Sequence, residues 1–268
     1  MIKLIASDMD GTLLNDRKEL PGDFFEVFDE LERRGIKFTV ASGRSFDAVA
    51  HLFPEEYRTR LDFICDNGAN VIHEGKQVSV TPLDRPTFEQ LIRACEDIGG
   101  LRILVCAGRG TYHLTADAEF SAEIAKYYKN HIPCDDLLSV DDVIYKLAVC
   151  DMKGTQQHAK PAIDAIFGDR LNVQVSGPIW MDVMGAGVSK GSALRALGKH
   201  LGISADDTMA FGDFYNDADM LKYAGWSFAM ENGNPDIKRM TRFLARSNNE
   251  NGVLRAIRKY ALQEDSIK

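Results

Sequence analysis

The sequence lacks the marks of a membrane or secreted protein. No segment approaches the ~20 consecutive apolar residues that a membrane-spanning helix needs, and the apolar start, residues 1–6, is too short for a signal peptide. There is no run of five or more like charges, no repeat and no low-complexity segment. These absences predict a cytoplasmic protein that does not enter a membrane.

Patterned cysteine and histidine are also missing. The five cysteines include no CxxC pair and are odd in number, and the six histidines do not have metal-ligand spacing. We therefore expect reduced, buried thiols rather than a disulfide framework, and no histidine-based zinc site.

Basic residues are in deficit, since 32 Lys and Arg face 40 Asp and Glu, giving a formal net charge of -8. Nucleic acids and anionic membranes attract basic surfaces, so this balance argues against both as partners.

The chain opens with a pattern typical of α/β proteins. Residues 2–6, 36–41 and 63–65 are short apolar runs of the kind found in buried parallel strands. Between the first two runs, Pro21 opens and Gly35 closes a helical pattern with apolar residues on one face. This β-α-β-α-β order predicts a doubly wound, mainly parallel sheet.

The pattern changes near Pro82 and returns to alternating helices and strands at Ser189. The intervening stretch predicts an α+β unit with helices near 88–95, 118–130 and 156–167 and strands at 101–106, 111–114, 144–150, 173–175 and 179–183. We therefore expect residues 1–81 and 185–268 to form an α/β catalytic core, and residues 82–184 an inserted α+β cap domain.

Two acidic clusters follow apolar strands. Asp8 and Asp10, in Asp-Met-Asp-Gly-Thr, come at the end of the first strand, where alternation predicts that both carboxylates face one site. Asp213, Asn216 and Asp217 follow the strand at 208–211. An Asp-Gly turn and a helix N-cap are the structural alternatives. Together, however, the clusters can supply the oxygen ligands of one Mg²⁺.

Two further segments have residues that suit a phosphate group. Ser42, Gly43 and Arg44 follow the second strand and open a helix, where a hydroxyl and backbone N–H groups can bind an anion. Lys190 begins the helix after the insertion, although cations usually favour the other helix end. A plain N-cap serine and a surface lysine are the alternatives. The glycines near Lys190 fit neither a P-loop nor a dinucleotide fingerprint.

In this order, Asp8-x-Asp10-Gly-Thr, Ser42, Lys190 and Gly-Asp213-x-x-Asn216-Asp217 resemble the four motifs of the haloacid dehalogenase superfamily. The insertion lies between the second and third motifs, as in the Cof-type phosphatases. Residues 66–69, Asp-Asn-Gly-Ala, resemble their Glu-Asn-Gly-Ala stretch with Asp in place of Glu, and residues 248–253 resemble their closing Asn…Gly-Val segment.

The resemblance implies a Mg²⁺-dependent phosphatase, a phosphoric monoester hydrolase, that acts on a small phosphorylated metabolite through an aspartyl-phosphate. A sugar phosphate or a phosphorylated cofactor is the implied substrate. Asp8 is then the nucleophile, and Asp10 is the general acid and base, whose main-chain oxygen also contacts Mg²⁺. Asp213 is the third metal ligand, and Asp217 orients the metal ligands.

The resemblance also implies residues that hold the phosphoryl group, namely Ser42, Gly43, Lys190 and Asn216. Arg44 and Asn67 are candidates for contacts with the rest of the substrate. The cap is expected to select the substrate.

Other activities share these motifs. A dehalogenase needs no protonated leaving oxygen, so the second acid, Asp10, favours phosphate esters. A phosphomutase stays open, as does a catalytically idle regulatory binding protein on the same fold. The complete set of acidic and basic residues argues against the idle protein.

Overall fold

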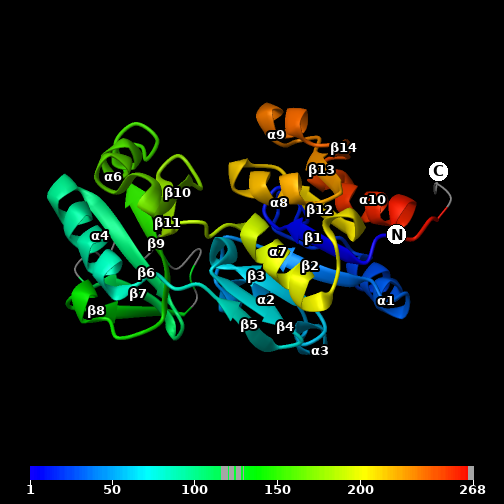
Figure 1. Cartoon of the computed structure of the whole chain (residues 1–268), viewed down its shortest axis with the longest axis horizontal. Helices are drawn as coiled ribbons and strands as arrows, with labels where there is room; N and C mark the ends of the chain where they lie inside the picture. Colours follow the sequence, from blue (N-terminus) through cyan, green and yellow to red (C-terminus); the bar gives the residue numbers. More distant parts are fainter. Residues whose placement is uncertain (116–119, 121–123, 125–127, 129, 265–268) are drawn as a thin grey trace. The chain divides into compact units, whose positions relative to one another are not determined.

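The computed structural model describes residues 1–115, 120, 124, 128 and 130–264, and the chain divides into two compact units (Figure 1). The first unit consists of Met1–Gly43, Leu52–Ser79 and Ser189–Lys268. The second consists of Arg44–His51 and Val80–Val188.

An eight-stranded sheet forms the centre of the first unit. Its strand order is β14-β13-β12-β1-β2-β3-β4-β5, and neighbouring strands from β14 to β3 are parallel, whereas β4 runs antiparallel to β3. The strands are β1 Leu4–Asp8, β2 Lys37–Ala41, β3 Asp62–Cys65, β4 Asn70–His73, β5 Lys76–Val80, β12 Thr208–Gly212, β13 Trp226–Met230 and β14 Phe243–Ala245. The expected mainly parallel sheet is confirmed.

Helices pack on both faces of this sheet, as a doubly wound fold requires. On one face, α1 (Phe24–Arg33) packs against β2 and α10 (Gly252–Tyr260) against β14, and the two helices contact each other. On the other face, α7 (Lys190–Leu201), α8 (Ala218–Tyr223) and α9 (Pro235–Met240) share an apolar core with the sheet.

The first face is rich in aromatic side chains, and the second is mostly aliphatic. The Phe24 ring lies 5.4 Å from that of Phe38 on β2. On the opposite face, Leu4 and Ala6 of β1 pack with Leu194 of α7, because alternate residues of a strand point to opposite faces.

The second unit is built on a six-stranded sheet of order β10-β11-β9-β6-β7-β8, antiparallel except for the parallel pair β7–β8. Helices α4 (Arg85–Ile98) and α6 (Ala159–Phe167) share an apolar core with this sheet. The strands are β6 Leu101–Ala107, β7 Gly110–Leu114, β8 His131–Cys134, β9 Ile144–Asp151, β10 Leu171–Val175 and β11 Trp180–Gly185. The helix expected near 118–130 falls mostly outside the described residues.

Several short elements have no counterpart in the sequence-based expectation. They are β4, β5, β8, β14, α3 (Glu55–Arg58), α9 and single 3₁₀ turns such as Asp66–Gly68. The helix expected after the second strand is the short α2 (Phe46–Ala50). Helix α6 begins at residue 159 rather than 156, because the preceding residues are mostly in turns. An oxygen of the Asp151 carboxylate accepts the Ala159 N–H at 3.1 Å, at the start of the helix. Among the described residues, no helix combines the length and apolarity needed to cross a bilayer.

Candidate active site

The candidate site lies at the topological switch point of the parallel sheet. Strand β1 pairs with β2 on one side and with β12 on the other, and all three run parallel. Asp8 is the last residue of β1, and Asp213 directly follows β12. Ligands of doubly wound sheets bind at this kind of switch point, outside the carboxyl ends of the strands.

Three carboxylates and one ammonium group converge there. Asp8, Asp213 and Asp217, here called the acidic cluster, each place a carboxylate oxygen within 4.8 Å of the others. The fully buried Lys190 Nζ donates to Asp8 Oδ1 at 2.5 Å and to Asp217 Oδ1 at 2.7 Å. One positive charge therefore faces three carboxylates, and Lys190 is buried in the site rather than on the surface.

The electrostatics of the cluster follow from burial and like charge. Burial raises the pKa of Asp8 well above its ordinary value, against the effect of the Lys190 charge. Burial, followed by repulsion from Asp217, raises the pKa of Asp213 to about 6. Burial alone lowers the pKa of Lys190, but the two neighbouring carboxylates reverse this and hold it above its usual value. The site therefore favours an additional positive charge.

Asp217 is fixed by the loop that carries Asp213. Its Oδ2 accepts the main-chain N–H groups of Asp213 and Phe214, at 3.0 and 3.2 Å, while its Oδ1 is held by Lys190. Ser189 caps helix α7 in a reciprocal capping box with Ser192, which places Lys190 at the first position of the helix. Both oxygens of Asp217 are therefore engaged within the protein.

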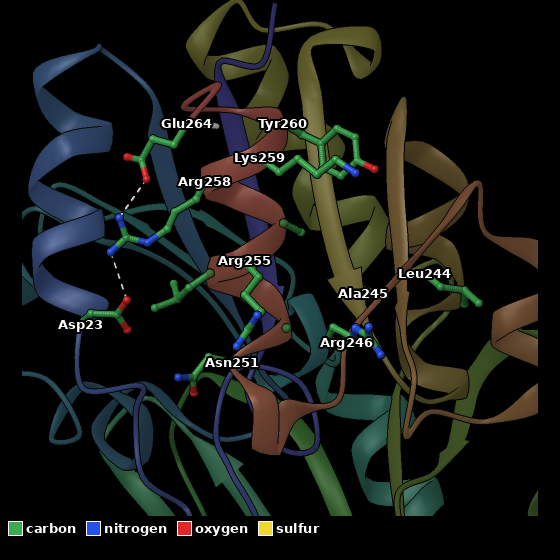
Figure 2. A pocket seen from close by; sticks show the side chains of 13 residues that line it. Asp23, Leu244, Ala245, Arg246, Asn251, Arg255, Arg258, Lys259, Tyr260 and Glu264 are labelled. Atoms are coloured by element: carbon green, nitrogen blue, oxygen red, sulfur yellow. Dashed lines mark hydrogen bonds and ion pairs between the residues drawn. The ribbon is translucent and has the colours of Figure 1, made fainter. Parts of the chain in front are cut away.

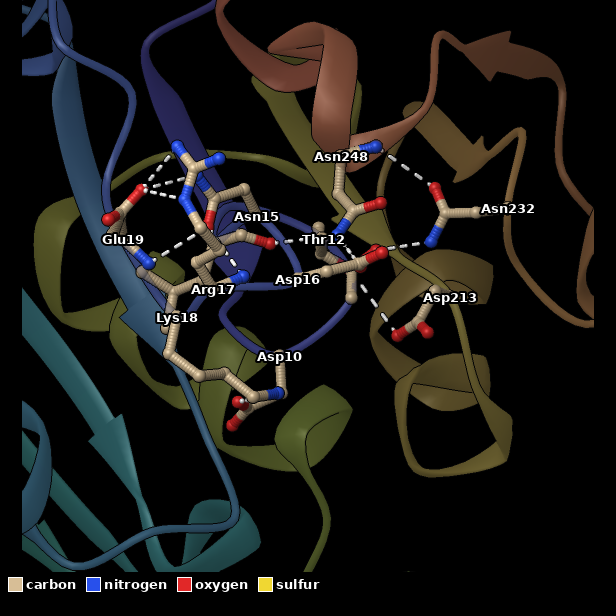
Figure 3. Close-up of polar contacts among 12 residues, drawn as sticks. Asp10, Thr12, Asn15, Asp16, Arg17, Lys18, Glu19, Asp213, Asn232 and Asn248 are labelled. Atoms are coloured by element: carbon tan, nitrogen blue, oxygen red, sulfur yellow. Dashed lines mark hydrogen bonds and ion pairs between the residues drawn. The ribbon is translucent and has the colours of Figure 1, made fainter.

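The loop after β1 packs closely on Asp213 (Figure 3). Gly11 has φ +81°, and a Cβ there would lie 2.5 Å from Asp213 Oδ2, so a larger residue would displace that carboxylate. Thr12 Oγ1 donates to Asp213 Oδ1 at 3.3 Å, and Asn232 Nδ2 donates to the Gly11 carbonyl at 2.8 Å.

Asp10 does not join the acidic cluster. Strand β1 ends at Asp8, so the strand alternation that predicted a shared site for both carboxylates does not extend to Asp10. Its Oδ1 instead accepts a hydrogen bond from Lys18 Nζ at 2.9 Å (Figure 3), and 38% of the solvent-accessible surface of its side chain is exposed. Asp10 still lies close enough to contribute to the raised pKa of Asp213.

The serine segment after β2 differs from the expectation. Helix α2 begins at Phe46 with Ser45 as its N-cap, so Ser42 does not open a helix, and the prediction of an anion-binding helix N-terminus at Ser42 is wrong. Ser42 is buried, its N–H donates to the Ile64 carbonyl at 2.8 Å, and its carbonyl accepts the Asn67 N–H at 3.1 Å.

Asn67 links this segment to the second acidic motif. Asn216 Nδ2 donates to Asn67 Oδ1 at 3.4 Å, and a Cβ on Gly43 would lie 3.0 Å from the same oxygen. Asn67 is 1% exposed, so its side chain is committed to these loops in the structure. Arg44 belongs to the second unit.

The sequence pattern predicts no role for Thr12, Lys18 or Asn232, and it marks Asn248 only as part of the segment 248–253. Asn232 Oδ1 accepts the Asn248 N–H, and Asn248 Nδ2 donates to the Leu14 carbonyl, each at 3.0 Å. Both asparagines therefore brace the loop after β1. The available signal was that Asn232 follows the carboxyl end of β13.

A separate pocket of about 570 Å³ lies between β14 and α10, and Figure 2 shows its lining. Arg258, which lines it, is paired with Asp23 and Glu264 at 3.0 Å each. No member of the acidic cluster lines this pocket, so it is distinct from the candidate active site.

Comparison with known proteins agrees with this geometry. Residues 5–257 match the model of the haloacid dehalogenase-like hydrolase family. The chain is 31% identical over 265 residues to the 5-amino-6-(5-phospho-D-ribitylamino)uracil phosphatase of Escherichia coli (strain K12), covering 98% of this chain and 97% of that one. It is 28% identical over 239 residues to the HMP-PP phosphatase of Klebsiella pneumoniae (strain 342), covering 89% and 87%.

The fold is also found among solved structures. A Streptococcus mutans UA159 protein superposes with a TM-score of 0.90 at 28% identity, over 98% of this chain and 100% of that one. The sequence-based expectations of the family and of a phosphatase are thereby confirmed. The chain belongs to the haloacid dehalogenase-like hydrolase family and is a phosphatase of that family.

Proposed function

We propose that this phosphatase is Mg²⁺-dependent and hydrolyses a small phosphorylated metabolite through an aspartyl-phosphate on Asp8. The observation that carries the proposal is the buried acidic cluster with Lys190 bridging two of its carboxylates at the switch point of the sheet. The two curated relatives described above act, by their names, on small phosphorylated compounds, and they match most of this chain.

The residues present fit a divalent cation with hard oxygen ligands. Three carboxylates gather around one ammonium group, and Asp213 has a pKa of about 6 because burial and a neighbouring charge penalise its ionised form. Asp8 and Asp213 would hold Mg²⁺ through carboxylate oxygens, and Asp10 through its main-chain oxygen. Bound Mg²⁺ would neutralise charge on the phosphoryl oxygens and on the acidic cluster.

Asp8 supplies the nucleophile in this proposal. Lys190 holds Asp8 Oδ1, which leaves the second oxygen to attack phosphorus as the bond from phosphorus to the leaving oxygen breaks. Water then attacks the phosphoryl group, the bond between Asp8 and phosphorus breaks, and inorganic phosphate leaves. Lys190 would also offer positive charge to the phosphoryl oxygens, and in this proposal Ser42, Gly43 and Asn216 would bind them as further polar groups.

Asp10 transfers the protons. It donates one to the leaving oxygen in the first step and takes one from the attacking water in the second. Its carboxylate is 38% exposed and pairs with Lys18 at 2.9 Å, whereas Asp217 is held by main-chain N–H groups of its own loop. Asp217 keeps the Asp213 loop in place and does not react.

The test is phosphate release by purified protein across a panel of phosphorylated metabolites, with Mg²⁺ and with EDTA. Acid quenching during turnover with ³²P-labelled substrate is expected to trap label on the peptide containing Asp8. Asp8→Asn should lose both signals, whereas Asp206→Asn, which removes an exposed carboxylate elsewhere, should keep both. Turnover that is equal in EDTA, or label on another residue, would overturn the proposal.

A further inference from the structure

The loop after β13 contacts both loops that carry the proposed metal ligands. Asn232 Nδ2 donates to the Gly11 carbonyl at 2.8 Å, in the loop after β1 (Figure 3). Two residues further on, the Asn234 N–H donates to the Asp213 carbonyl at 2.8 Å. Gly233 packs so closely that a Cβ there would lie 3.0 Å from the same carbonyl oxygen. One short segment therefore fixes the loops after β1 and β12 relative to each other.

The orientation of the Asn232 amide follows from its two partners. The Asn248 main-chain N–H can only donate, and it donates to Asn232 Oδ1 at 3.0 Å. The Gly11 carbonyl can only accept, so it must face Nδ2. Exchanging the two ends of the amide would place donor against donor and acceptor against acceptor. An aspartate at this position, which only accepts, would keep the contact with Asn248 and lose the one with Gly11.

The Gly11 carbonyl is where this contact can affect the reaction. Gly11 directly follows Asp10 and has φ +81°, a conformation that glycine adopts without steric cost. Because glycine resists rotation of its backbone so little, the chain beyond Asp10 needs an outside contact to hold one course. The hydrogen bond from Asn232 supplies such a contact, and it thereby restricts the direction of the Asp10 side chain and main-chain oxygen.

We propose that Asn232 is a positioning residue of this phosphatase, which acts through Gly11 to align Asp10 with the leaving oxygen. The inference rests on the roles proposed above for Asp8 and Asp10. Asn232 is exposed, and one exposed hydrogen bond between an amide and a carbonyl adds little to stability. A displacement of about 1 Å at a catalytic group, by contrast, can slow a reaction about a hundredfold.

A second asparagine on the same loop provides the matched control. Asn249 Oδ1 accepts the Asp16 N–H at 3.1 Å, and Asn249 Nδ2 donates to Asp16 Oδ2 at 2.9 Å. Asn249 thus makes two hydrogen bonds to the loop after β1, at a position well beyond Asp10. If general bracing of this loop were all that mattered, loss of Asn249 would be at least as harmful as loss of Asn232.

The test is steady-state phosphate release in saturating Mg²⁺ by wild type, Asn232→Ala, Asn232→Asp and Asn249→Ala. The substrates are 4-nitrophenyl phosphate and an alkyl phosphate from the metabolite panel. On the alkyl phosphate, both Asn232 variants should lose about 10–100-fold in kcat, with KM changed by less than about threefold. Asn249→Ala should stay within about twofold of wild type. Asn232→Asp keeps the contact with Asn248, so its loss reports on Gly11.

The leaving group gives a second readout, which a merely structural role would not move. An alkoxide needs a proton from Asp10 as it leaves, whereas 4-nitrophenolate is stable without one. In both Asn232 variants, kcat/KM should therefore fall at least about fivefold more for the alkyl phosphate than for 4-nitrophenyl phosphate. Equal losses on the two substrates, or a loss in Asn249→Ala that matches that in Asn232→Ala, would overturn the proposal.

Failure of this inference differs from failure of the proposed function. Wild type that turns over equally in EDTA, or that carries label on a residue other than Asp8, contradicts the proposed function. Wild type that behaves as proposed, together with Asn232 variants that keep its kcat on both substrates, contradicts only the role of Asn232. Because Asn232 is exposed, both variants should fold, and thermal melts verify that they are folded at the assay temperature.

Discussion

Replacing Asp213 by Asn should stabilise the metal-free protein and weaken its response to Mg²⁺. Asp213 has a pKa of about 6 in the folded protein against an ordinary value of 3.8. Each unit of difference between the two pKa values corresponds to about 1.36 kcal/mol. Ionisation of Asp213 therefore lowers the free energy of unfolding by at most about 3 kcal/mol, a limit reached above about pH 7. Asn removes that charge and keeps an oxygen that can accept from Thr12 Oγ1.

The pH dependence gives the sign of the effect. Because the folded pKa of Asp213 is raised, the folded protein holds this proton up to a higher pH than the unfolded chain does. The contribution of the protonated Asp213 carboxyl group to the free energy of unfolding is therefore fully present below about pH 3.8, and it is lost as the pH rises through about 6. The advantage of Asp213→Asn in EDTA should thus be largest above pH 7 and fall to about half at pH 5.

Thermal melts in EDTA and in millimolar Mg²⁺ measure both effects. In EDTA at pH 7.5, the thermal unfolding midpoint of Asp213→Asn should be up to about 6–12 °C above that of wild type. Wild type should gain about 2.7 kcal/mol at one hundred times the dissociation constant of Mg²⁺. The variant should lose most of this gain because it lacks a ligand.

Asp206→Asn removes one negative charge at an exposed position and is the control, with an expected change within about 0.5 kcal/mol. If Asp213→Asn melts well below wild type in EDTA and keeps the full Mg²⁺ shift, then Asp213 is a structural residue and not a metal ligand.

Three further outcomes are expected. Asp8→Asn should lower kcat roughly a thousandfold or more while the protein stays folded, because an amide is a poor nucleophile, and steady-state phosphate release checks this. Ca²⁺ should inhibit in competition with Mg²⁺, because it accepts more ligands at longer distances and loosens the alignment of Asp8; equal rates with either ion would contradict the proposed arrangement. Lys190→Met should destabilise the metal-free protein by about 3–5 kcal/mol, because it leaves buried carboxylates without their cation, and Mg²⁺ should restore part of the loss in denaturant titrations. A variant as stable as wild type in EDTA would show that Lys190 does not neutralise the cluster.

The sequence predicted the elements that carry the site better than the contacts within it. Apolar runs and helical periodicity located β1, β2, β12 and α7, since these elements are buried on at least one face and show it in their pattern. The three-residue β14 is too short for a periodic signal, and the five-residue α2 starts at Phe46 rather than at the predicted Ser42. The pairing of Asp10 with Lys18 depends on a loop that leaves β1 after Asp8, and strand alternation has no information about such a loop.

The residue types and their places at strand ends were determined by the sequence alone. The acidic residues directly after buried strands and the lysine at the start of a helix are local features of the sequence. When such residues come together, they can bind a metal ion and a phosphate group. Folding decided which of them meet. Asp8 and Lys190 are 182 positions apart in the chain, and their 2.5 Å contact exists because β1 pairs in parallel with β12 while α7 packs beside them. Tertiary packing also buries Lys190 completely. Because charges interact more strongly in a buried site than in water, its ammonium group can hold two carboxylates together.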